Sequence, residues 1–179
     1  MAAQTLGYQI TVLDPTSDSP AGRIAERHLK ADYLDYQALA DLSNTCAAIT
    51  TEFENVPAEA LRYLAQQRVV SPAANSVSIA QDRIQEKQFL SANGFAVAPF
   101  AVIQAGDDLA SPRYQSLCPG ILKVSQLGYD GKGQVRVTHI DDLPLAFDKL
   151  HQVPCVLEQL LPLSCEISVI LARGFNGEI

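Results

Sequence analysis

The 179-residue sequence predicts an α/β protein in which a parallel-sheet unit is followed by a unit of mixed α+β type. In the first part of the chain, short β-branched runs alternate with helix-like stretches, which is typical of β-α-β units. In the second part, short strand candidates outnumber helices. A turn-rich segment, Ser71-Pro72-Ala73-Ala74-Asn75, separates the two patterns. We therefore expect one domain over residues 1–75 and another over residues 76–179.

The first domain is expected to contain three strands and two main helices. The strand candidates are Gln9–Leu13, Cys46–Thr50 and Val69–Ser71, and the helix candidates lie around Gln37–Leu42 and Pro57–Gln66. In the second helix, Pro57 suits the first helical position, and Ala60, Leu61 and Leu64 share one face that we expect to be buried. A helix-like stretch over Ala2–Leu6 comes before any strand, so the usual opening strand is expected to be missing.

The second domain is expected to begin with one long helix and to continue mainly as strands. The pattern predicts a helix over Val77–Ala92 that stops at Gly94, a residue type that readily takes a left-handed conformation. The later strand candidates are Gly120–Val124, Val135–Thr138, Cys155–Glu158 and Ile167–Arg173, and one further helix is expected over Asp141–Leu150.

Charge and hydropathy exclude several classes of partner. A net charge of -7 and a pI near 4.8 argue against binding to a nucleic-acid backbone, which needs clustered Lys and Arg. The apolar runs fall short of the roughly 20 residues that span a bilayer, so no membrane segment is expected. The first residues show neither a basic lead nor an apolar signal core. A cytoplasmic protein is the resulting expectation.

The cysteines and histidines suggest no metal centre. Cys46, Cys118, Cys155 and Cys165 show no CxxC spacing, and the three histidines form no paired metal motif. We expect four reduced cysteines that serve as small buried apolar residues, and we name no metal ligand.

The strongest chemical signal is an apolar strand that carries Lys123 and leads into a loop with Gly128, Gly131 and Gly133. Glycines let backbone N–H groups approach phosphate oxygens closely, and a lysine supplies compensating charge. The order of residues is neither that of a P-loop nor that of the dinucleotide fingerprint. On spacing alone, a plain glycine-rich hairpin with a surface lysine remains an equal alternative.

Several stretches in order extend this signal over nearly the whole chain. They are Leu13-Asp14-Pro15 with Asp18-Ser19-Pro20-Ala21-Gly22, Thr51 to Pro57, Gln81-Asp82-Arg83 with Glu86-Lys87, Leu122 to Gln134, and Leu157-Glu158-Gln159 with Glu166-Ile167-Ser168. Together they resemble the N5-carboxyaminoimidazole ribonucleotide synthetases of the ATP-grasp superfamily. The resemblance implies a truncated Rossmann-like pre-ATP-grasp domain with a parallel sheet, followed by the first part of an α+β ATP-grasp domain.

The resemblance also implies a reaction. ATP, bicarbonate and 5-aminoimidazole ribonucleotide would give the N5-carboxylated ribonucleotide, ADP and phosphate in purine biosynthesis, through carboxyphosphate. Mg²⁺ would be held by residues outside this chain, and the full-length enzyme could be a homodimer. The family pattern further implies that both ends are cut short: a glycine-rich turn would precede Met1, and the second half of the ATP-grasp domain would follow Gly177-Glu178-Ile179. The isolated chain is accordingly expected to be inactive.

By the same resemblance, fourteen residues would bind ATP. Lys123 would hold the phosphates, the glycine loop would close over them, and Arg83 would contribute from the preceding helix. Backbone groups of the stretch that starts at Glu158 would read the adenine edge, and Glu166 would bind the ribose. The full set is Arg83, Lys123, Gly128, Tyr129, Asp130, Gly131, Lys132, Gly133, Gln134, Glu158, Gln159, Leu160, Leu161 and Glu166.

Four of the carboxylate and phenol side chains have expected roles toward the substrate. Tyr129 and Asp130 would be catalytic, with Asp130 close to the substrate amine, as the resemblance implies. Glu52 and Glu54 follow a predicted strand at its carboxyl end, where open α/β sheets bind ligands, so we expect them to contact the substrate.

Simpler interpretations of the acidic and basic residues stay open. Arg83 fits a surface pair with Glu86 on a helix. Glu158 fits a solvated carboxylate at a strand end, and Glu166 must face water or have a partner, because an unpaired buried carboxylate is costly.

Two other functions stay open for the chain as a whole. One is a formate-dependent glycinamide ribonucleotide transformylase, although the Tyr129-Asp130 pair within Leu127 to Gly133 differs from the Ser-Ser-Gly-Lys-Gly core expected there. The other is a non-catalytic ATP-binding fragment.

Overall fold

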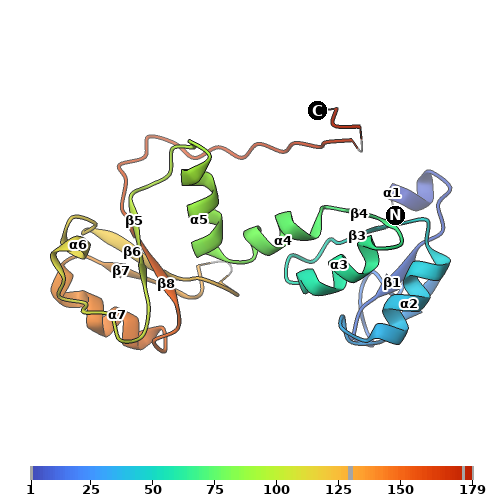
Figure 1. Cartoon of the computed structure of the whole chain (residues 1–179), viewed down its shortest axis with the longest axis horizontal. Helices are drawn as coiled ribbons and strands as arrows, with labels where there is room; N and C mark the ends of the chain where they lie inside the picture. Colours follow the sequence, from blue (N-terminus) through green and yellow to red (C-terminus); the bar gives the residue numbers. More distant parts are fainter. Residues whose placement is uncertain (1, 129–130, 175, 179) are drawn as a thin grey trace.

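Two units make up the chain, and two consecutive helices, α4 (Ala74–Ala80) and α5 (Arg83–Ala92), run between them (Figure 1). The computed structural model describes residues 2–128, 131–174 and 176–178. α4 packs on the first unit, where Val77 joins a small core with Leu61 and Ala74. α5 contacts the sheet of the second unit. The division at residue 75 stays a prediction.

The first unit contains two separate pairs of parallel strands, β1-β2 and β3-β4. Its elements are α1 (Ala2–Thr5), β1 (Thr11–Leu13), β2 (Arg27–Leu29), α2 (Tyr36–Thr45), β3 (Ala48–Thr50), α3 (Ala58–Ala65) and β4 (Val69–Ser71). The parallel pairing follows from the predicted β-α-β rhythm, because a helix connects β3 to β4. β2 is missing from the prediction, since a three-residue strand with Arg27 and His28 offers no apolar run.

The helices of this unit bury the faces that their sequences predict. Ala60, Leu61 and Leu64 of α3 are all buried, as expected from their spacing. Leu39 and Leu42 of α2 pack against Ala60 and Leu64, with strand residues at the edge of the same core. Pro57 differs slightly from the prediction, because it precedes the helix as its N-cap and is not its first helical residue.

The predicted single helix over Val77–Ala92 is wrong, because the chain breaks at Gln81 and Asp82 to give α4 and α5. Asp82 has an extended backbone (φ -124°, ψ 108°), and its carboxylate accepts hydrogen bonds from the N–H groups of Ile84 (2.9 Å) and Gln85 (3.4 Å). Such side-chain caps compete with helix continuation and start a new helix instead. The stop at Gly94 is confirmed, with φ at +79°.

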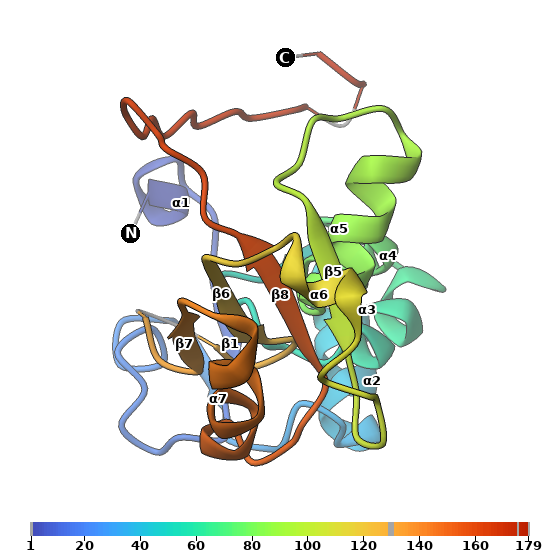
Figure 2. The ribbon, with the colours of Figure 1, turned by 90° about the vertical axis from the view of Figure 1, so that its left-hand side faces the viewer.

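The second unit is built on a four-stranded antiparallel sheet in the order β5-β8-β6-β7. Helices cover both faces of this sheet: α7 lies on one side and α5 on the other (Figure 2). Its elements are β5 (Phe100–Ile103), α6 (Pro112–Gln115), β6 (Gly120–Val124), β7 (Gln134–Val137), the 3-10 turn η1 (Ile140–Asp142), α7 (Leu143–Lys149) and β8 (Cys155–Gln159). Three of these strands match the prediction closely, while β5 and α6 were not expected.

The core of the second unit lies between the sheet and α7. Leu122 and Leu157 from the central strands meet Leu143 and Phe147 of α7 there. Because side chains alternate along a strand, Val156 and Glu158 of β8 must face the opposite side, toward α5. All of the first four residues of β8 are buried, which fits a strand covered on both faces.

The predicted strand over Ile167–Arg173 is wrong. Residues 160–174, all described, contain no strand, and the segment runs as an extended stretch from the second unit across the view of Figure 1, above α5 and α4. A β-strand needs a partner for its backbone ladder, and none lies alongside this segment in the part of the chain that the structure describes. Its apolar side chains are therefore exposed, and Ile170 is 95% exposed.

The cysteines are free, as expected, but they are not uniformly buried. Cys155 lies in the core of the second unit, whereas Cys165 is exposed on the extended segment. Among the described residues, the helices are all too short or too polar to cross a membrane.

Candidate functional site

The hairpin that joins β6 to β7 borders a small, open cavity of about 90 Å³. Its walls come from β6, the hairpin, the first residue of β7 and the first residue of α5, so segments far apart in sequence meet here. The lining residues are Arg83, Lys123, Gly128, Gly131, Lys132, Gly133 and Gln134, all of them predicted ATP-binding residues. Three of the seven carry positive charge, which makes this cavity suited to an anion.

The hairpin needs its glycines for steric reasons. Gly131 and Gly133 have φ values of +77° and +71°, a region that side chains rarely adopt. A Cβ at Gly133 would also lie 2.6 Å from Cγ2 of Val124, so the loop folds against the strand too closely for any other residue. The hairpin therefore brings bare backbone to the wall of the cavity, and its role as a phosphate-binding loop stays a prediction.

Glu158 sits beside this cavity and joins two lysines. Its Oε2 accepts a hydrogen bond from Nζ of Lys87 at 3.0 Å and lies 3.2 Å from Nζ of Lys123. The Glu158 side chain is only 11% exposed, so its interpretation as a solvated strand-end carboxylate is wrong. Burial raises the pKa of Glu158, but the hydrogen bond from Lys87 and the charge of Lys123 outweigh it, and the pKa lies below its ordinary value.

Lys87 is absent from the predicted site, although it belongs to one of the stretches that carry the family resemblance. A signal for it exists in the sequence: Lys87 follows Arg83 by four residues, so both lie on one face of α5. That face is the one turned toward β8. The sequence does not reveal the partner of Lys87, because Glu158 lies on strand β8, 71 residues further along the chain.

Arg83 ties α5 to the end of β6. Its backbone N–H donates to the carbonyl of Ser125 at 2.8 Å, and its guanidinium donates to the carbonyl of Val124. Among the described residues no ion pair joins Arg83 to Glu86, so the expected alternative of a surface helix pair is wrong. Arg83 is fixed in place by the strand that also carries Lys123.

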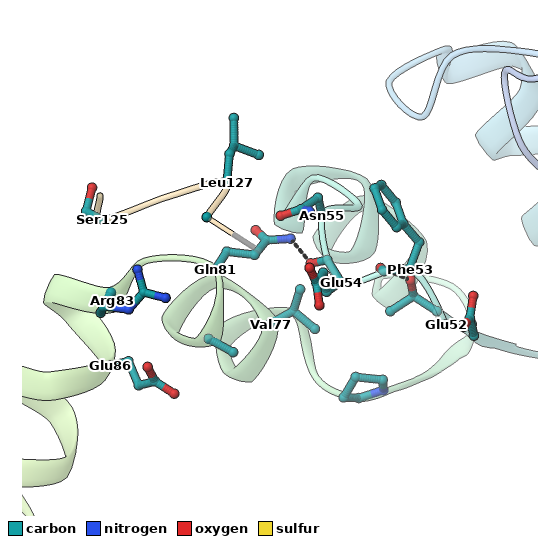
Figure 3. Close-up of a pocket in the computed structure, with 14 residues that line it drawn as sticks. Glu52, Phe53, Glu54, Asn55, Val77, Gln81, Arg83, Glu86, Ser125 and Leu127 are labelled. Atoms are coloured by element: carbon teal, nitrogen blue, oxygen red, sulfur yellow. Dashed lines mark hydrogen bonds between the residues drawn. The ribbon is translucent and has the colours of Figure 1, made fainter. Parts of the chain in front are cut away.

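A larger cavity of about 360 Å³ lies between the first unit and the hairpin (Figure 3). Glu52 and Glu54 line it on one side, and Arg83, Glu86 and Leu127 line it on the other. The remaining lining residues are Thr51, Phe53, Asn55, Pro72, Val77, Ala80, Gln81, Ser125 and Gly128. Arg83 and Gly128 border both cavities, so the structure brings the two predicted glutamates to the same region as the glycine hairpin.

Gln81 fixes the glutamate-bearing loop in the larger cavity. Its side-chain amide donates to the carbonyl of Glu54 at 2.7 Å (Figure 3). The same amide also donates to the carbonyl of Val56 at 2.6 Å. Next along the chain, Asp82 accepts a hydrogen bond from the amide of Gln126 at 3.0 Å. The connector Gln81-Asp82-Arg83 therefore contacts the glutamate loop on one side and the base of the hairpin on the other.

Other predicted residues lie apart from these cavities. The N–H groups of Gln159 and Leu160 already donate to the carbonyls of Pro99 (2.9 Å) and Pro119 (2.9 Å), so these two groups are not available to an adenine ring. Leu161 is exposed, and Glu166 faces water on the extended segment. Tyr129 and Asp130 lie outside the described residues. Within the described ranges, no three Asp, Glu, His or Cys side chains gather where they could hold a metal ion.

Two domain families match this chain. Residues 1–81 match the ribonucleotide synthetase preATP-grasp domain, and residues 88–179 match the ATP-grasp domain. These matches agree with the α/β fold that the structure shows, a parallel-stranded unit followed by an antiparallel one.

Sequence and structure comparisons give relatives that are all named as N5-carboxyaminoimidazole synthases or synthetases. The chain is 39% identical over 181 residues to the N5-carboxyaminoimidazole ribonucleotide synthase of Brucella melitensis, covering all of this chain and 50% of that protein. A crystal structure of the Staphylococcus aureus synthetase complexed with ADP superposes with a TM-score of 0.82 at 35% identity, covering 89% of this chain and 43% of that one. The Aspergillus clavatus synthase in complex with ADP and 5-aminoimidazole ribonucleotide gives a TM-score of 0.75 at 26% identity, covering 89% and 42%. The chain thus spans about half the length of the curated relatives it matches.

Proposed function

This chain belongs to the ATP-grasp family, and from that premise we propose that it supplies the nucleotide-binding part of an enzyme that carboxylates 5-aminoimidazole ribonucleotide. The enzyme would use ATP and bicarbonate and release ADP and phosphate, with N5-carboxyaminoimidazole ribonucleotide as the product in purine biosynthesis. The observation that carries the proposal is the cationic, glycine-walled cavity at the β6-β7 hairpin. The Brucella melitensis synthase, which matches all of this chain, and the Staphylococcus aureus synthetase, which matches 89% of it, support the proposal.

The residues around the small cavity fit the phosphates of ATP. Arg83, Lys123 and Lys132 bring positive charge, and Gly131 and Gly133 bring backbone without side chains. In phosphoryl transfer, positioned cations and N–H donors stabilise charge on the transferring group, which is most of what the protein contributes. ATP supplies the phosphoryl group that activates bicarbonate. We propose that the Mg²⁺ that accompanies ATP is held by residues outside this chain.

The larger cavity fits the ribonucleotide. Glu52 and Glu54 offer acceptors for ribose hydroxyls or for the amine, and Arg83 borders both this cavity and the cationic one. A substrate placed there would lie next to the phosphates. The Aspergillus clavatus complex supports this choice, since that synthase holds 5-aminoimidazole ribonucleotide and ADP together.

The remaining roles stay proposals from the family resemblance. Tyr129 and Asp130 would act at the meeting point of amine and activated bicarbonate, and Glu166 would bind the ribose. Backbone groups of the stretch from Glu158 to Leu161 that are not used within the fold would contact the adenine. We also propose a homodimer, as the resemblance implies, and a cytoplasmic enzyme, as expected from the lack of a membrane segment and of a signal core in the sequence.

The activity test uses a protein that contains this chain at the length of the curated relatives. ADP release is measured with ATP, bicarbonate and 5-aminoimidazole ribonucleotide together, and again with each of the last two omitted. The proposal expects rapid ADP release and N5-carboxylated product only when all three are present. Turnover with formate and glycinamide ribonucleotide would support the transformylase instead. ATP binding without turnover of either substrate pair would support a non-catalytic nucleotide-binding protein.

A further inference from the structure

Glu158 makes an ion-pair arrangement that the proposed ATP roles do not use. One of its oxygens, Oε2, serves two ammonium groups, Lys87 from α5 and Lys123 from β6. The Lys87 side chain is 15% exposed and the Lys123 side chain is 24% exposed, so the three groups are largely withdrawn from water. The cluster carries one net positive charge.

The two lysines are not equivalent. Lys123 lines the cationic cavity, whereas Lys87 does not. Lys87 instead lies with its ammonium 6.0 Å from the centre of the Phe100 ring, while it donates its hydrogen bond to Glu158. Only Lys123 of this pair can therefore turn toward a phosphate in that cavity.

A phosphate that enters the cavity competes with Glu158 for the ammonium of Lys123, whose three N–H donors both anions can use. When Lys123 turns away, Glu158 loses one of its two partners. Leaving a buried carboxylate with no partner is strongly unfavourable, whereas a carboxylate that keeps one hydrogen-bonded lysine is tolerated. The presence of Lys87 thus decides how costly it is for Lys123 to leave.

We propose that Lys87 is a positioning residue for the nucleotide: by holding Glu158, it frees Lys123 to bind a phosphate. This inference rests on the proposed function, because it takes the ligand of the cavity to be a nucleoside phosphate. Lys87 acts through Glu158 and does not touch the nucleotide itself.

The proposal predicts an unusual pattern among four variants. Lys87→Met leaves Glu158 with Lys123 alone, so ATP affinity falls by about tenfold, within the usual range for coupling between groups. Lys87→Met combined with Glu158→Gln removes the carboxylate that retains Lys123, so most of the lost affinity returns. Lys87→Arg keeps the charge and binds ATP nearly as the wild type does. Lys30→Met, at an exposed lysine of the first unit that is absent from the linings of both cavities, serves as the matched control.

The dissociation constants are measured by isothermal titration calorimetry with Mg-ATP in a protein that contains this chain at the length of the curated relatives, alongside a thermal melt of each variant. Recovery in the double variant supports the proposal, because a merely structural role for Lys87 would make the double variant weaker still. Equal weakness of single and double variants overturns it, and so does wild-type affinity in Lys87→Met.

A second measurement does not depend on ATP binding. Carbon-13 NMR of the Glu158 carboxyl is followed through acid titration in the wild type and in Lys87→Met. Among the described residues, the charged groups that face this carboxyl are Lys87 and Lys123, and the proposal expects its pKa to rise when Lys87 is removed. An unchanged pKa overturns the inference even if ATP binds. If ATP does not bind the wild type and the pKa still rises, the proposed function fails while the pairing stands.

Discussion

Lys123 both pairs with Glu158 and lines the cavity that we assign to phosphates. Its ammonium lies 3.2 Å from Glu158, and its side chain lines the hairpin cavity. On the proposal above, its charge is available to the ligand only because a second lysine shares the same carboxylate.

We predict that Lys123→Ala weakens ATP binding by about ten- to a hundredfold, because a charge-assisted hydrogen bond to a phosphate, worth about 1.5–3 kcal/mol, is lost. The melting temperature should change little, because Glu158 keeps its hydrogen bond from Lys87. Calorimetric titration with ATP and a thermal melt check both parts. Wild-type ATP affinity in this variant would show that the cavity binds something other than nucleotide phosphates.

A pH-dependent contribution to stability belongs to Glu158. Its pKa in the folded protein lies below the ordinary value of 4.5, so the pairing stabilises the fold above that pH and is lost as the pH falls through the folded pKa. In Glu158→Gln, the two lysines would repel each other without a carboxylate between them. We predict that this variant is less stable than wild type by about 2–4 kcal/mol at pH 7, and that the difference shrinks as the pH falls below the ordinary pKa of 4.5.

Urea unfolding at about pH 7 and about pH 3.5 measures this difference directly. Glu26→Gln is a suitable comparison, because that carboxylate is exposed and its pKa is also lowered, mainly by a hydrogen bond from Gln4. A gap between wild type and Glu158→Gln that stays constant with pH would show that folding leaves the pKa of this carboxyl unchanged, so that the two lysines do not stabilise its charged form.

At the scale of elements, the β6-β7 hairpin depends on two glycines for different reasons. Gly131 needs its glycine only for its backbone angle, because a Cβ there would meet nothing closer than 3.6 Å. Gly133 has both a positive φ and a neighbour at 2.6 Å, Cγ2 of Val124. The same substitution should therefore have different effects at the two positions.

We predict that Gly131→Ala costs about 1–2 kcal/mol of stability, which is the usual strain of a left-handed side chain. Gly133→Ala should cost more, since Val124 on β6 must also move, and it should weaken ATP binding further because Lys123 is the next residue on that strand. Denaturant unfolding and ATP titration of the two variants check the order. A larger loss of stability for Gly131→Ala than for Gly133→Ala would show that the close contact between Gly133 and Val124 does not limit the hairpin.

The sequence predicts elements well where local pattern decides them, as at α3 and β6. It fails where two local signals compete: the apolar periodicity of Val77–Ala92 runs on, but the capping carboxylate of Asp82 divides it. It also fails where a strand lacks a partner, as in Ile167–Arg173, because β-propensity cannot supply the ladder.

The same contrast holds for the candidate site. Lys123 and the glycines form a local pattern that one stretch of sequence carries. The pairing of Lys87 with Glu158 arises only when α5 packs on β8, and no local signal predicts it. Both ends of this contact are visible in the sequence as single residues, but the contact itself belongs to the tertiary fold.

At the scale of the whole molecule, three consecutive residues of the connector form hydrogen bonds with both units. Gln81 bonds to the loop of the first unit, Asp82 caps α5 and accepts from Gln126, and Arg83 bonds to the end of β6. The two cavities meet at this connector. A change in the angle between the units would therefore alter the site directly, because its walls belong to both.

The extended segment over residues 167–171 determines how the whole chain should behave in concentrated solution. Ile167, Val169, Ile170 and Leu171 are strongly exposed, and no proline interrupts them. Short β-prone apolar segments with free backbone groups pair with copies of themselves and seed aggregation. We predict that the chain aggregates as its concentration rises, and that Ile170→Lys slows this several-fold while ATP affinity stays the same.

Light scattering over time compares the two proteins at equal concentration, with Leu145→Lys, an exposed position on α7, as the control for added charge alone. If both variants slow aggregation equally, the cause is the added charge, and the extended segment does not drive aggregation.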